Sequence, residues 1–342
     1  MAAVAAPHAI EVRGLRKSYW VREGGLLRGR RRRIEALRGV SFTVGWGEVY
    51  GLLGPNGAGK TTTVKIIATL LEPDEGDALV AGYSSVREPL EVRERIGVML
   101  SVERGFFWKL TARENLKYFG LLYGLDGREL EERIEELLEL TGLKRLGAEN
   151  RRFEDMSLGM RARLGLARAL LRDPPVLILD EPTLGLDPPS ARMVRSILRK
   201  LASRGKAVLL TTHNMFEAEI VCDRVGIISR GRVIAEGSPG ELKARVSDRV
   251  PVVLHVRASP TEAEALAQRI GGAVSRLTER DGGLLYVRVL ADPESAERII
   301  QRAIEEALRL GVRVAEARIE EPTLEDVFIA LTGASEEGGG GG

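Results

Sequence analysis

The sequence predicts an α/β protein: a parallel or mixed β-sheet with helices on its faces, followed by a smaller α+β domain. Three observations lead to this prediction. A glycine-rich loop, residues 54–62, stands between an apolar run of strand length and a run with helical spacing. A second apolar run, residues 176–179, ends in two carboxylates, as a strand buried on both faces can. Residues 252–319 then follow the order β-α-β-β-α-β.

Length and composition set the first limits. The 342 residues leave room for two domains, and 44% hydrophobic and 29% charged residues are typical of a folded, soluble protein. No run approaches the roughly 18 apolar residues of a membrane span, and the N-terminal residues 1–7 are too short for a signal peptide, so we expect a cytoplasmic protein. The single cysteine, Cys222, excludes an internal disulfide. A net charge of +2 implies no general affinity for nucleic acid.

The first strands are expected at residues 9–20 and 40–44. Tyr19, an aromatic residue ahead of the glycine loop, is our candidate to stack on an adenine ring, and packing at a sheet edge is the alternative. Six arginines lie between the strands: Arg22, Arg28, Arg30, Arg31, Arg32 and Arg33. Two interpretations of this stretch stay open. It is either a solvated loop or a surface for anionic lipid headgroups, near which each basic residue contributes about 1 kcal/mol.

The glycine-rich loop carries the most specific motif. Its residues are Gly54, Pro55, Asn56, Gly57, Ala58, Gly59, Lys60, Thr61 and Thr62, which fit the spacing G-x-x-x-x-G-K-[ST]. We expect its three glycines to adopt positive φ and to bring backbone N–H groups against phosphate oxygens. The helix that begins beside Lys60 adds its partial positive charge, Lys60 can reach the β- and γ-phosphates, and the Thr61 hydroxyl can bind Mg²⁺. The sequence therefore predicts a P-loop NTPase fold.

A helical subdomain is expected over about residues 111–172, after further strands at residues 76–81 and 95–100. Thr111 and Glu114 form a capping box ahead of a helix, and apolar residues at helical spacing predict a second, amphipathic helix over residues 127–140. A third helix is expected over residues 161–171. Ser157, which precedes it, is by itself an ordinary N-cap residue.

The apolar run of residues 176–179 delivers Asp180 and Glu181 to the carboxyl end of a buried strand. These two carboxylates cannot both be core residues, because an unpaired buried charge is strongly destabilising. Asp180 is placed to hold Mg²⁺, and Glu181 to orient and deprotonate a hydrolytic water. The next buried strand, residues 207–211, ends ahead of His213, which we expect to contact the γ-phosphate at the same sheet edge.

The order of these motifs resembles that of the ATP-binding cassette (ABC) ATPases, over about residues 9–240. The matching landmarks are Tyr19, the loop of residues 54–62, the signature Met156-Ser157-Leu158-Gly159-Met160, the pair Asp180-Glu181, Asp187 and the switch His213. The resemblance implies that two copies close head to tail, with ATP and Mg²⁺ between the loop of one and residues 157–159 of the other. It also implies separate transmembrane permease subunits and a peripheral position on the inner face of the cell membrane.

The sequence departs from the family pattern in two places. The signature has one glycine, Gly159, where the common form has two, and it lacks the final glutamine of that form. Residues 96–108 lack the glutamine that senses Mg²⁺ and the transporter in the family; Ser101 occupies the matching position, and Glu103 lies close by. Three aromatics, Phe106, Phe107 and Trp108, follow in the region where the family docks its membrane partner. A local hydrophobic cluster is the alternative.

Beyond a Gly-Ser-Pro-Gly break at residues 237–240, residues 241–333 are expected to form an accessory domain of the ferredoxin-like type, which serves dimer support or regulation. Residues 321–331 resemble the closing motif of the exporter branch that includes daunorubicin-type drug exporters and polysaccharide exporters. Residues 334–342 are expected to be a disordered tail.

The sequence thus predicts the ATP-hydrolysing subunit of an export system, with no nucleic-acid partner. Two alternatives remain. One is a soluble cassette ATPase that acts on nucleic acid or the ribosome, although the chain lacks the second cassette or long coiled coil that such relatives usually carry. The other is a regulatory cassette that binds ATP but hydrolyses it weakly, against which Lys60, Asp180, Glu181 and His213 argue.

Overall fold

The computed structural model describes residues 6–23, 30–100, 105–245, 250–276 and 284–332. The chain forms two compact units, Met1–Pro239 and Gly240–Gly342. In the part of the chain that the structure describes, no helix is both long and apolar enough to cross a membrane. Ser101, Glu103 and the tail expected over residues 334–342 lie outside the described residues.

The first unit is built on a six-stranded sheet of order β10-β9-β3-β8-β7-β6. Its strands are β3 (Val49–Leu53), β6 (Ile96–Met99), β7 (Val176–Asp180), β8 (Ala207–Thr212), β9 (Arg224–Ser229) and β10 (Arg232–Gly237). All neighbours run parallel except β9 and β10, which pair antiparallel at the edge. The central strands β3, β7 and β8 are buried along nearly their whole length, which explains why they read as continuous apolar runs.

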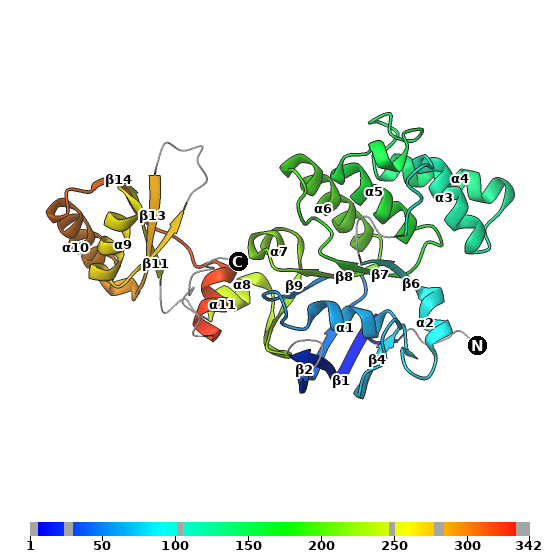
Figure 1. The fold of residues 1–342 in the computed structure, drawn as a ribbon, viewed down its shortest axis with the longest axis horizontal. Coiled ribbons are helices and arrows are strands. Elements are labelled where there is room, and N and C mark those ends of the chain that lie inside the picture. Colours follow the sequence, from blue (N-terminus) through cyan, green and yellow to red (C-terminus); the bar gives the residue numbers. More distant parts are fainter. Residues whose placement is uncertain (1–5, 24–29, 101–104, 246–249, 277–283, 333–342) are drawn as a thin grey trace. The chain divides into compact units, whose positions relative to one another are not determined.

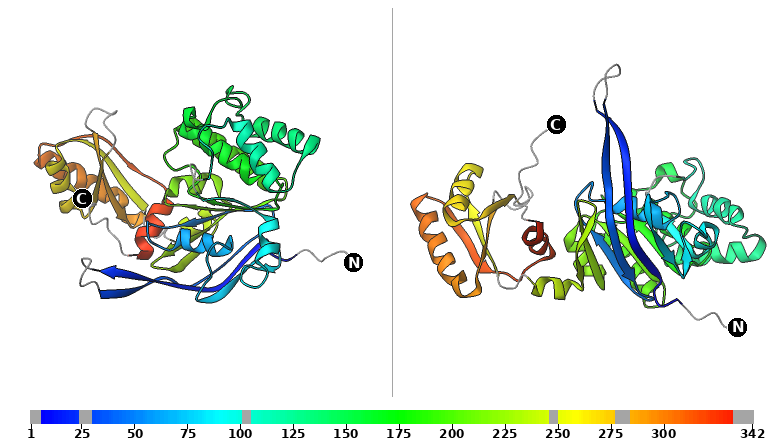
Figure 2. Two further views of the ribbon diagram at one scale, coloured as in Figure 1. Left: turned by 45° about the vertical axis from the view of Figure 1, so that its right-hand side comes forward. Right: turned by 90° about the horizontal axis from the view of Figure 1, so that it is seen from below.

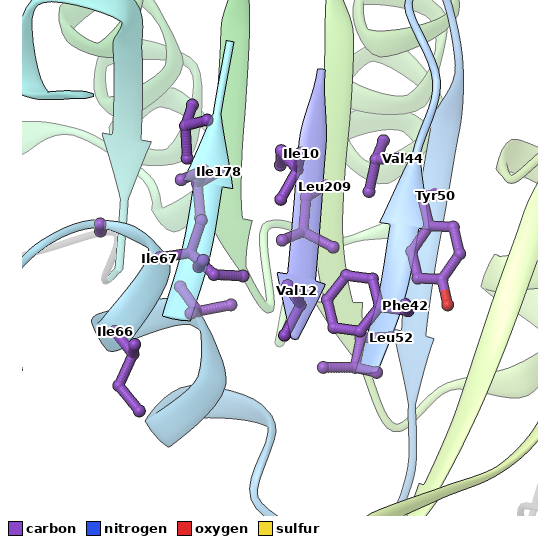
Figure 3. Packing of buried hydrophobic residues seen from close by; sticks show 14 of the residues in the cluster. Ile10, Val12, Phe42, Val44, Tyr50, Leu52, Ile66, Ile67, Ile178 and Leu209 are labelled. Atoms are coloured by element: carbon purple, nitrogen blue, oxygen red, sulfur yellow. The ribbon is translucent and has the colours of Figure 1, made fainter. Parts of the chain in front are cut away.

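A second, antiparallel sheet covers one face of the first together with α1 (Lys60–Ile67). Its order is β2-β1-β4-β5, with β1 (Ile10–Glu23), β2 (Arg30–Val44), β4 (Glu75–Val80) and β5 (Tyr83–Ser84). Apolar side chains of both sheets and of α1 form one core, in which the rings of Phe42 and Tyr50 stack with their centroids 5.1 Å apart (Figure 3). This packing fixes α1, and with it the preceding glycine loop, against the sheet.

The expectation of a loop for the basic stretch is wrong at residues 30–33. These arginines belong to β2, which pairs with β1 as far as Glu23 opposite Arg30. Strand propensity depends strongly on context, and here the ladder with β1 overrides the composition of the run.

Helices cover the opposite face of the six-stranded sheet (Figure 1): α5 (Leu158–Ala169), α6 (Pro188–Ala202) and α7 (Met215–Val221), with α3 (Ala112–Leu122) and α4 (Gly127–Leu140) beside α5. Thr111 and Glu114 form the predicted capping box. The third helix starts three residues before its predicted start, because Ser157 caps α5. The short helix α2 (Pro89–Arg95) was not predicted.

The second unit has the predicted ferredoxin-like order. Its elements are α8 (Pro239–Ala244, which begins one residue before the unit), β11 (Val250–Arg257), α9 (Pro260–Ile270), β12 (Ala273–Arg276), β13 (Leu284–Ala291), α10 (Ala296–Arg309), β14 (Arg313–Ile319) and α11 (Leu324–Thr332). The four strands form an antiparallel sheet of order β12-β13-β11-β14. Alternate residues of β11, namely Val252, Leu254 and Val256, are buried with apolar residues of α9 and α10. The side chain of Arg288 on β13 donates to Asp326 of α11 at 2.6 Å.

Candidate active site

Three neighbouring parallel strands, β3, β7 and β8, end at one edge of the sheet. Their register pairs Leu53 with Thr212 and Asp180 with Thr211. The glycine loop leaves β3, the two carboxylates close β7, and His213 follows β8. Because ligands of open α/β sheets bind beyond the carboxyl ends of the strands, this edge is the candidate active site.

Two residues of the glycine loop have a left-handed backbone conformation: Gly57, with φ of 80°, and Gly59, with φ of 113°. Gly54 is outside the left-handed region, so the expectation of a positive φ there is wrong. Its glycine has another physical reason: a Cβ at position 54 would lie 2.2 Å from the carbonyl oxygen of Ile228. The loop therefore uses glycine both for its turns and for a close backbone approach.

Helix α1 begins directly after this loop without a side-chain cap. Its first N–H groups are therefore placed to bind an anion such as phosphate. The side chain of Lys60 is only 6% exposed. Its Nζ donates to the carbonyl oxygens of Gly54 at 2.5 Å and Pro55 at 3.2 Å, and it lies 3.5 Å from Glu181 Oε1. The cation thus sits between the loop and the carboxylates.

Thr61 and Asp180 provide oxygen atoms of the kind that Mg²⁺ prefers. The Thr61 hydroxyl donates to Asp180 Oδ2 at 2.9 Å, and the Thr211 hydroxyl donates to the other carboxylate oxygen. Mg²⁺ is usually held by one or two protein oxygens together with substrate phosphates. These residues therefore fit Mg²⁺ bound with a nucleotide.

Glu181 and His213 face each other at this edge. Both carboxylate oxygens of Glu181 lie 3.0 Å from His213 Nδ1. Glu181 has a left-handed backbone, with φ of 49°, and its N–H donates to the carbonyl and hydroxyl oxygens of Thr211 at 3.2 and 3.1 Å. A non-glycine residue in this region is uncommon and is often found at functional sites.

Thr211 is a site residue that the sequence reasoning missed. Its hydroxyl contacts both Asp180 and the backbone of Glu181, and the residue is fully buried. In the sequence it reads as the last member of an apolar strand. A hydroxyl in a strand buried on both faces needs a partner, and that was the available signal.

Tyr19 lies beside the glycine loop, with its hydroxyl 3.4 Å from Thr62 Oγ1 and its ring partly exposed. This position leaves the ring accessible for stacking on a base. The prediction that it binds adenine stays a prediction.

The signature residues and Asp187 form a second group on the helices. Ser157 accepts a hydrogen bond from the N–H of Met160, and Asp187 caps α6 by accepting from the N–H and hydroxyl of Ser190 at 2.8 and 2.9 Å. These hydrogen bonds, the N–H first, lower the pKa of Asp187. A Cβ on Gly159 would lie 2.3 Å from Ser190 Oγ, so α5 and α6 touch here.

Among the described residues, the structure thus gathers Lys60, Thr61, Asp180, Glu181 and His213 at the sheet edge. Ser157, Leu158, Gly159 and Asp187 are gathered on α5 and α6 instead, on the sheet face opposite α1 (Figure 1). One copy of the chain therefore holds the two groups at separate places.

The comparison with known proteins agrees with this geometry. The family model described as ABC transporter matches residues 37–184. The chain is 40% identical over 300 residues to the daunorubicin resistance ATP-binding protein DrrA3 of Streptomyces coeruleorubidus, which covers 87% of this chain and 92% of that protein. It is 38% identical to the Nod factor export ATP-binding protein I of Rhizobium leguminosarum bv. viciae, with 97% of each chain covered.

Among solved structures, the chain resembles the dimeric, post-hydrolysis ATP-binding cassette MJ0796 bound to ADP and Pi. The TM-score is 0.58 at 27% identity, and the match covers 67% of this chain and 98% of that chain. The chain belongs to the ABC transporter family, as one of its ATP-binding, ATP-hydrolysing subunits.

Proposed function

We propose that this protein powers an export system, as a homodimer that hydrolyses ATP beneath separate permease subunits. The observation that carries the proposal is the meeting of Lys60, Thr61, Asp180 and Glu181 at one sheet edge. These residues supply a cation for phosphate, oxygen ligands for Mg²⁺ and a base for water, which are the parts that phosphoryl transfer requires. The names of the relatives, which refer to Nod factor export and daunorubicin resistance, support the direction of transport.

ATP binds with its phosphates along residues 54–62 and its adenine on Tyr19. Lys60 exchanges its neutral acceptors, the carbonyls of Gly54 and Pro55, for β- and γ-phosphate oxygens. This exchange is favourable because hydrogen bonds to ionised acceptors are stronger than those to neutral ones. Thr61 and Asp180 hold Mg²⁺, which neutralises charge on the phosphates when it is bound.

Glu181 is the general base. It orients the attacking water and takes its proton, while His213 holds both oxygens of the carboxylate in place. Thr211 positions Asp180 and Glu181, because its hydroxyl donates to the Asp180 carboxylate and accepts from the N–H of Glu181. Thr211 is a positioning residue in this proposal, since its hydroxyl acts through Asp180 and Glu181.

A second copy completes the site. Ser157, Leu158 and Gly159 lie at the N-terminus of α5 and would meet the γ-phosphate from across the dimer, adding a hydroxyl and helix N–H groups. Leu158 is partly exposed, as a residue at such an interface must be in the free subunit. Asp187 is the N-cap of α6, and we place the start of this helix at the same interface.

The permease contacts the helical subdomain at its exposed aromatics. Phe106 is buried against Phe153, so it belongs to the local cluster, whereas Phe107 and Trp108 are exposed. The Phe107 ring lies 4.5 Å from that of Tyr118, which is also exposed. An apolar patch of this kind is typical of a protein interface. Docking there would hold the protein on the inner face of the cell membrane.

Replacement of Glu181 by Gln tests the catalytic part of the proposal. Glutamine keeps the shape of the side chain and an oxygen for His213 but cannot take a proton, so single-turnover hydrolysis should fall about 10²- to 10⁴-fold while ATP binding persists. An ATP-bound dimer should then accumulate, and light scattering should detect it as a doubled molecular mass. The matched control is Glu129→Gln at an exposed position in the first turn of α4, which should behave as wild type. Hydrolysis at the wild-type rate by the Glu181→Gln protein would refute the base assignment.

Affinity purification from gently solubilised native membranes tests the transport part. The wild-type protein should recover a polytopic membrane protein, and Trp108→Ala should recover less of it. Trp46→Ala is the control, because Trp46 is also a partly exposed tryptophan, at 38% against 49% for Trp108. Recovery of soluble proteins or nucleic acid alone would contradict the proposal.

A further inference from the structure

Strands β1 and β2 extend beyond the rest of their sheet as a two-stranded arm. The third strand, β4, pairs with β1 only as far as Arg16. Further out, β1 and β2 pair only with each other, from Tyr19 opposite Ile34 to Glu23 opposite Arg30, and they leave the body of the first unit (Figure 2, right). We call residues 19–23 and 30–34 the arginine arm.

The arginine arm carries a concentrated positive charge. It contains five arginines and one glutamate, although the whole chain has a net charge of only +2. Four consecutive arginines, residues 30–33, belong to β2 in this ribbon, and like charges so close along the chain repel each other. A two-stranded ribbon is itself only marginally stable in water. A polyanionic surface would offset the repulsion and stabilise the arm.

The arm also exposes apolar side chains beside this charge. Trp20 is 69% exposed and lies opposite Arg33 in the register, and the next pair inward includes the partly exposed Ile34. Tryptophan prefers the interface between membrane and water, and arginine reaches from such an interface to headgroup phosphates. Charge and aromatic together therefore favour a lipid surface over the backbone of a nucleic acid.

The arm lies outside the residues that the family model matches. The family match begins at residue 37, after the arm has ended. Nor does the arm belong to the catalytic cluster, apart from Tyr19 at its base, whose hydroxyl lies 3.4 Å from Thr62 Oγ1. The features of Trp20 and of residues 30–33 thus need an explanation of their own.

We propose that the arginine arm binds the anionic phospholipid headgroups of the membrane that holds the permease. Its arginines pair with headgroup phosphates, and Trp20 lies at the level of the headgroups. The choice of membrane rests on the proposed function, but the lipid contact itself needs neither the permease nor ATP. The two proposals can therefore fail separately.

The test is co-sedimentation of the full-length protein with vesicles of phosphatidylcholine alone or with 30% phosphatidylglycerol, by weight, at low and high salt. We expect binding only to the phosphatidylglycerol vesicles, weakened by salt. Since each basic residue near an anionic surface is worth roughly a factor of five, replacing Arg30, Arg31, Arg32 and Arg33 by Ser should lower the partition coefficient on the order of 10²- to 10³-fold.

A matched control separates the arm from overall charge. It removes four exposed arginines at other places, and its partition coefficient should stay within a few-fold of wild type: Arg87, Arg128, Arg152 and Arg309. ATP hydrolysis by both variants shows that the cassette is folded. Equal loss of binding in the two variants would overturn the assignment to the arm.

Fluorescence of Trp20 provides a second readout. In a protein with Trp46 and Trp108 replaced by Phe, the emission of Trp20 should shift to the blue on phosphatidylglycerol vesicles and stay unchanged on phosphatidylcholine. An unchanged spectrum on both would overturn the lipid contact. So would binding to a short DNA duplex that is tighter than binding to the vesicles, since it would assign the arm to nucleic acid.

Discussion

Thr211 is the residue whose replacement most directly tests how the site is built. Its hydroxyl donates to Asp180 and accepts from the N–H of Glu181, so Thr211→Val removes both contacts at almost constant volume. A hydrogen bond to a charged group contributes about 1.5–3 kcal/mol. Asp180 is partly exposed, and the N–H of Glu181 keeps a second acceptor, the carbonyl of Thr211. We therefore expect a loss near the lower end, about 2 kcal/mol of the free energy of unfolding.

The control Thr211→Ser keeps the hydroxyl and loses one buried methyl group, which costs about 1 kcal/mol. Stability alone separates the two variants poorly, so the decisive assay is ATP hydrolysis as a function of Mg²⁺ concentration. Mutation of a residue that holds a metal ligand in place usually lowers the metal affinity on the order of 10- to 100-fold. Thr211→Val should raise the half-saturating Mg²⁺ concentration accordingly, and Thr211→Ser should change it less than about threefold. An unchanged Mg²⁺ dependence in Thr211→Val would refute the positioning role.

Two further predictions concern the group on α5 and α6. Gly159→Ala places a Cβ 2.3 Å from Ser190 Oγ, so overpacking should lower the free energy of unfolding measured in urea by about 1–3 kcal/mol. Gly240→Ala is the control, because neither glycine has a left-handed φ and a Cβ at position 240 meets nothing within 4 Å. Asp187 has a folded pKa below its ordinary value of 3.8, so its contribution to stability is present above that pH and is lost as the pH falls through the folded pKa. Asp187→Ala should therefore flatten the stability curve below about pH 4, and an acid limb as steep as that of wild type would contradict this assignment.

Most of the catalytic cluster could be predicted from the sequence, because each member follows a local pattern. Lys60 and Thr61 belong to a fixed spacing, and Asp180 and Glu181 end an apolar run. The contribution of Thr211 could not be read, because it depends on the register between β7 and β8, which sets Asp180 opposite Thr211. Sequence patterns locate strands but do not state which residues face each other across them.

The fold was predictable to a similar degree, and its failures have a common cause. Strands buried on both faces were found because they are continuous apolar runs, and α4 because its apolar residues recur at helical spacing. The strand at residues 30–33 was missed since its arginines have no strand-like periodicity and are ordered by pairing with β1 alone. Gly54 was misjudged for a related reason, because the close approach of Ile228 comes from a distant strand.

A short, hydrogen-bonded segment connects the cluster at the sheet edge to the group on α5 and α6. Residues 181–187 join the base to the cap of α6, and they are closed by turns in which the N–H of Leu184 donates to Glu181 and that of Leu186 to Thr183. The Thr183 hydroxyl donates to Glu217 on α7, the helix that follows His213 directly.

Segment 181–187 therefore connects Glu181 directly to Asp187, which accepts from the N–H and hydroxyl of Ser190. Ser190 in turn packs so closely against Gly159 of α5 that a Cβ there would lie 2.3 Å from its Oγ. Because Ser157 and Asp187 are the residues proposed to face a second copy, we expect nucleotide binding at Glu181 to alter the surface on which the dimer would form.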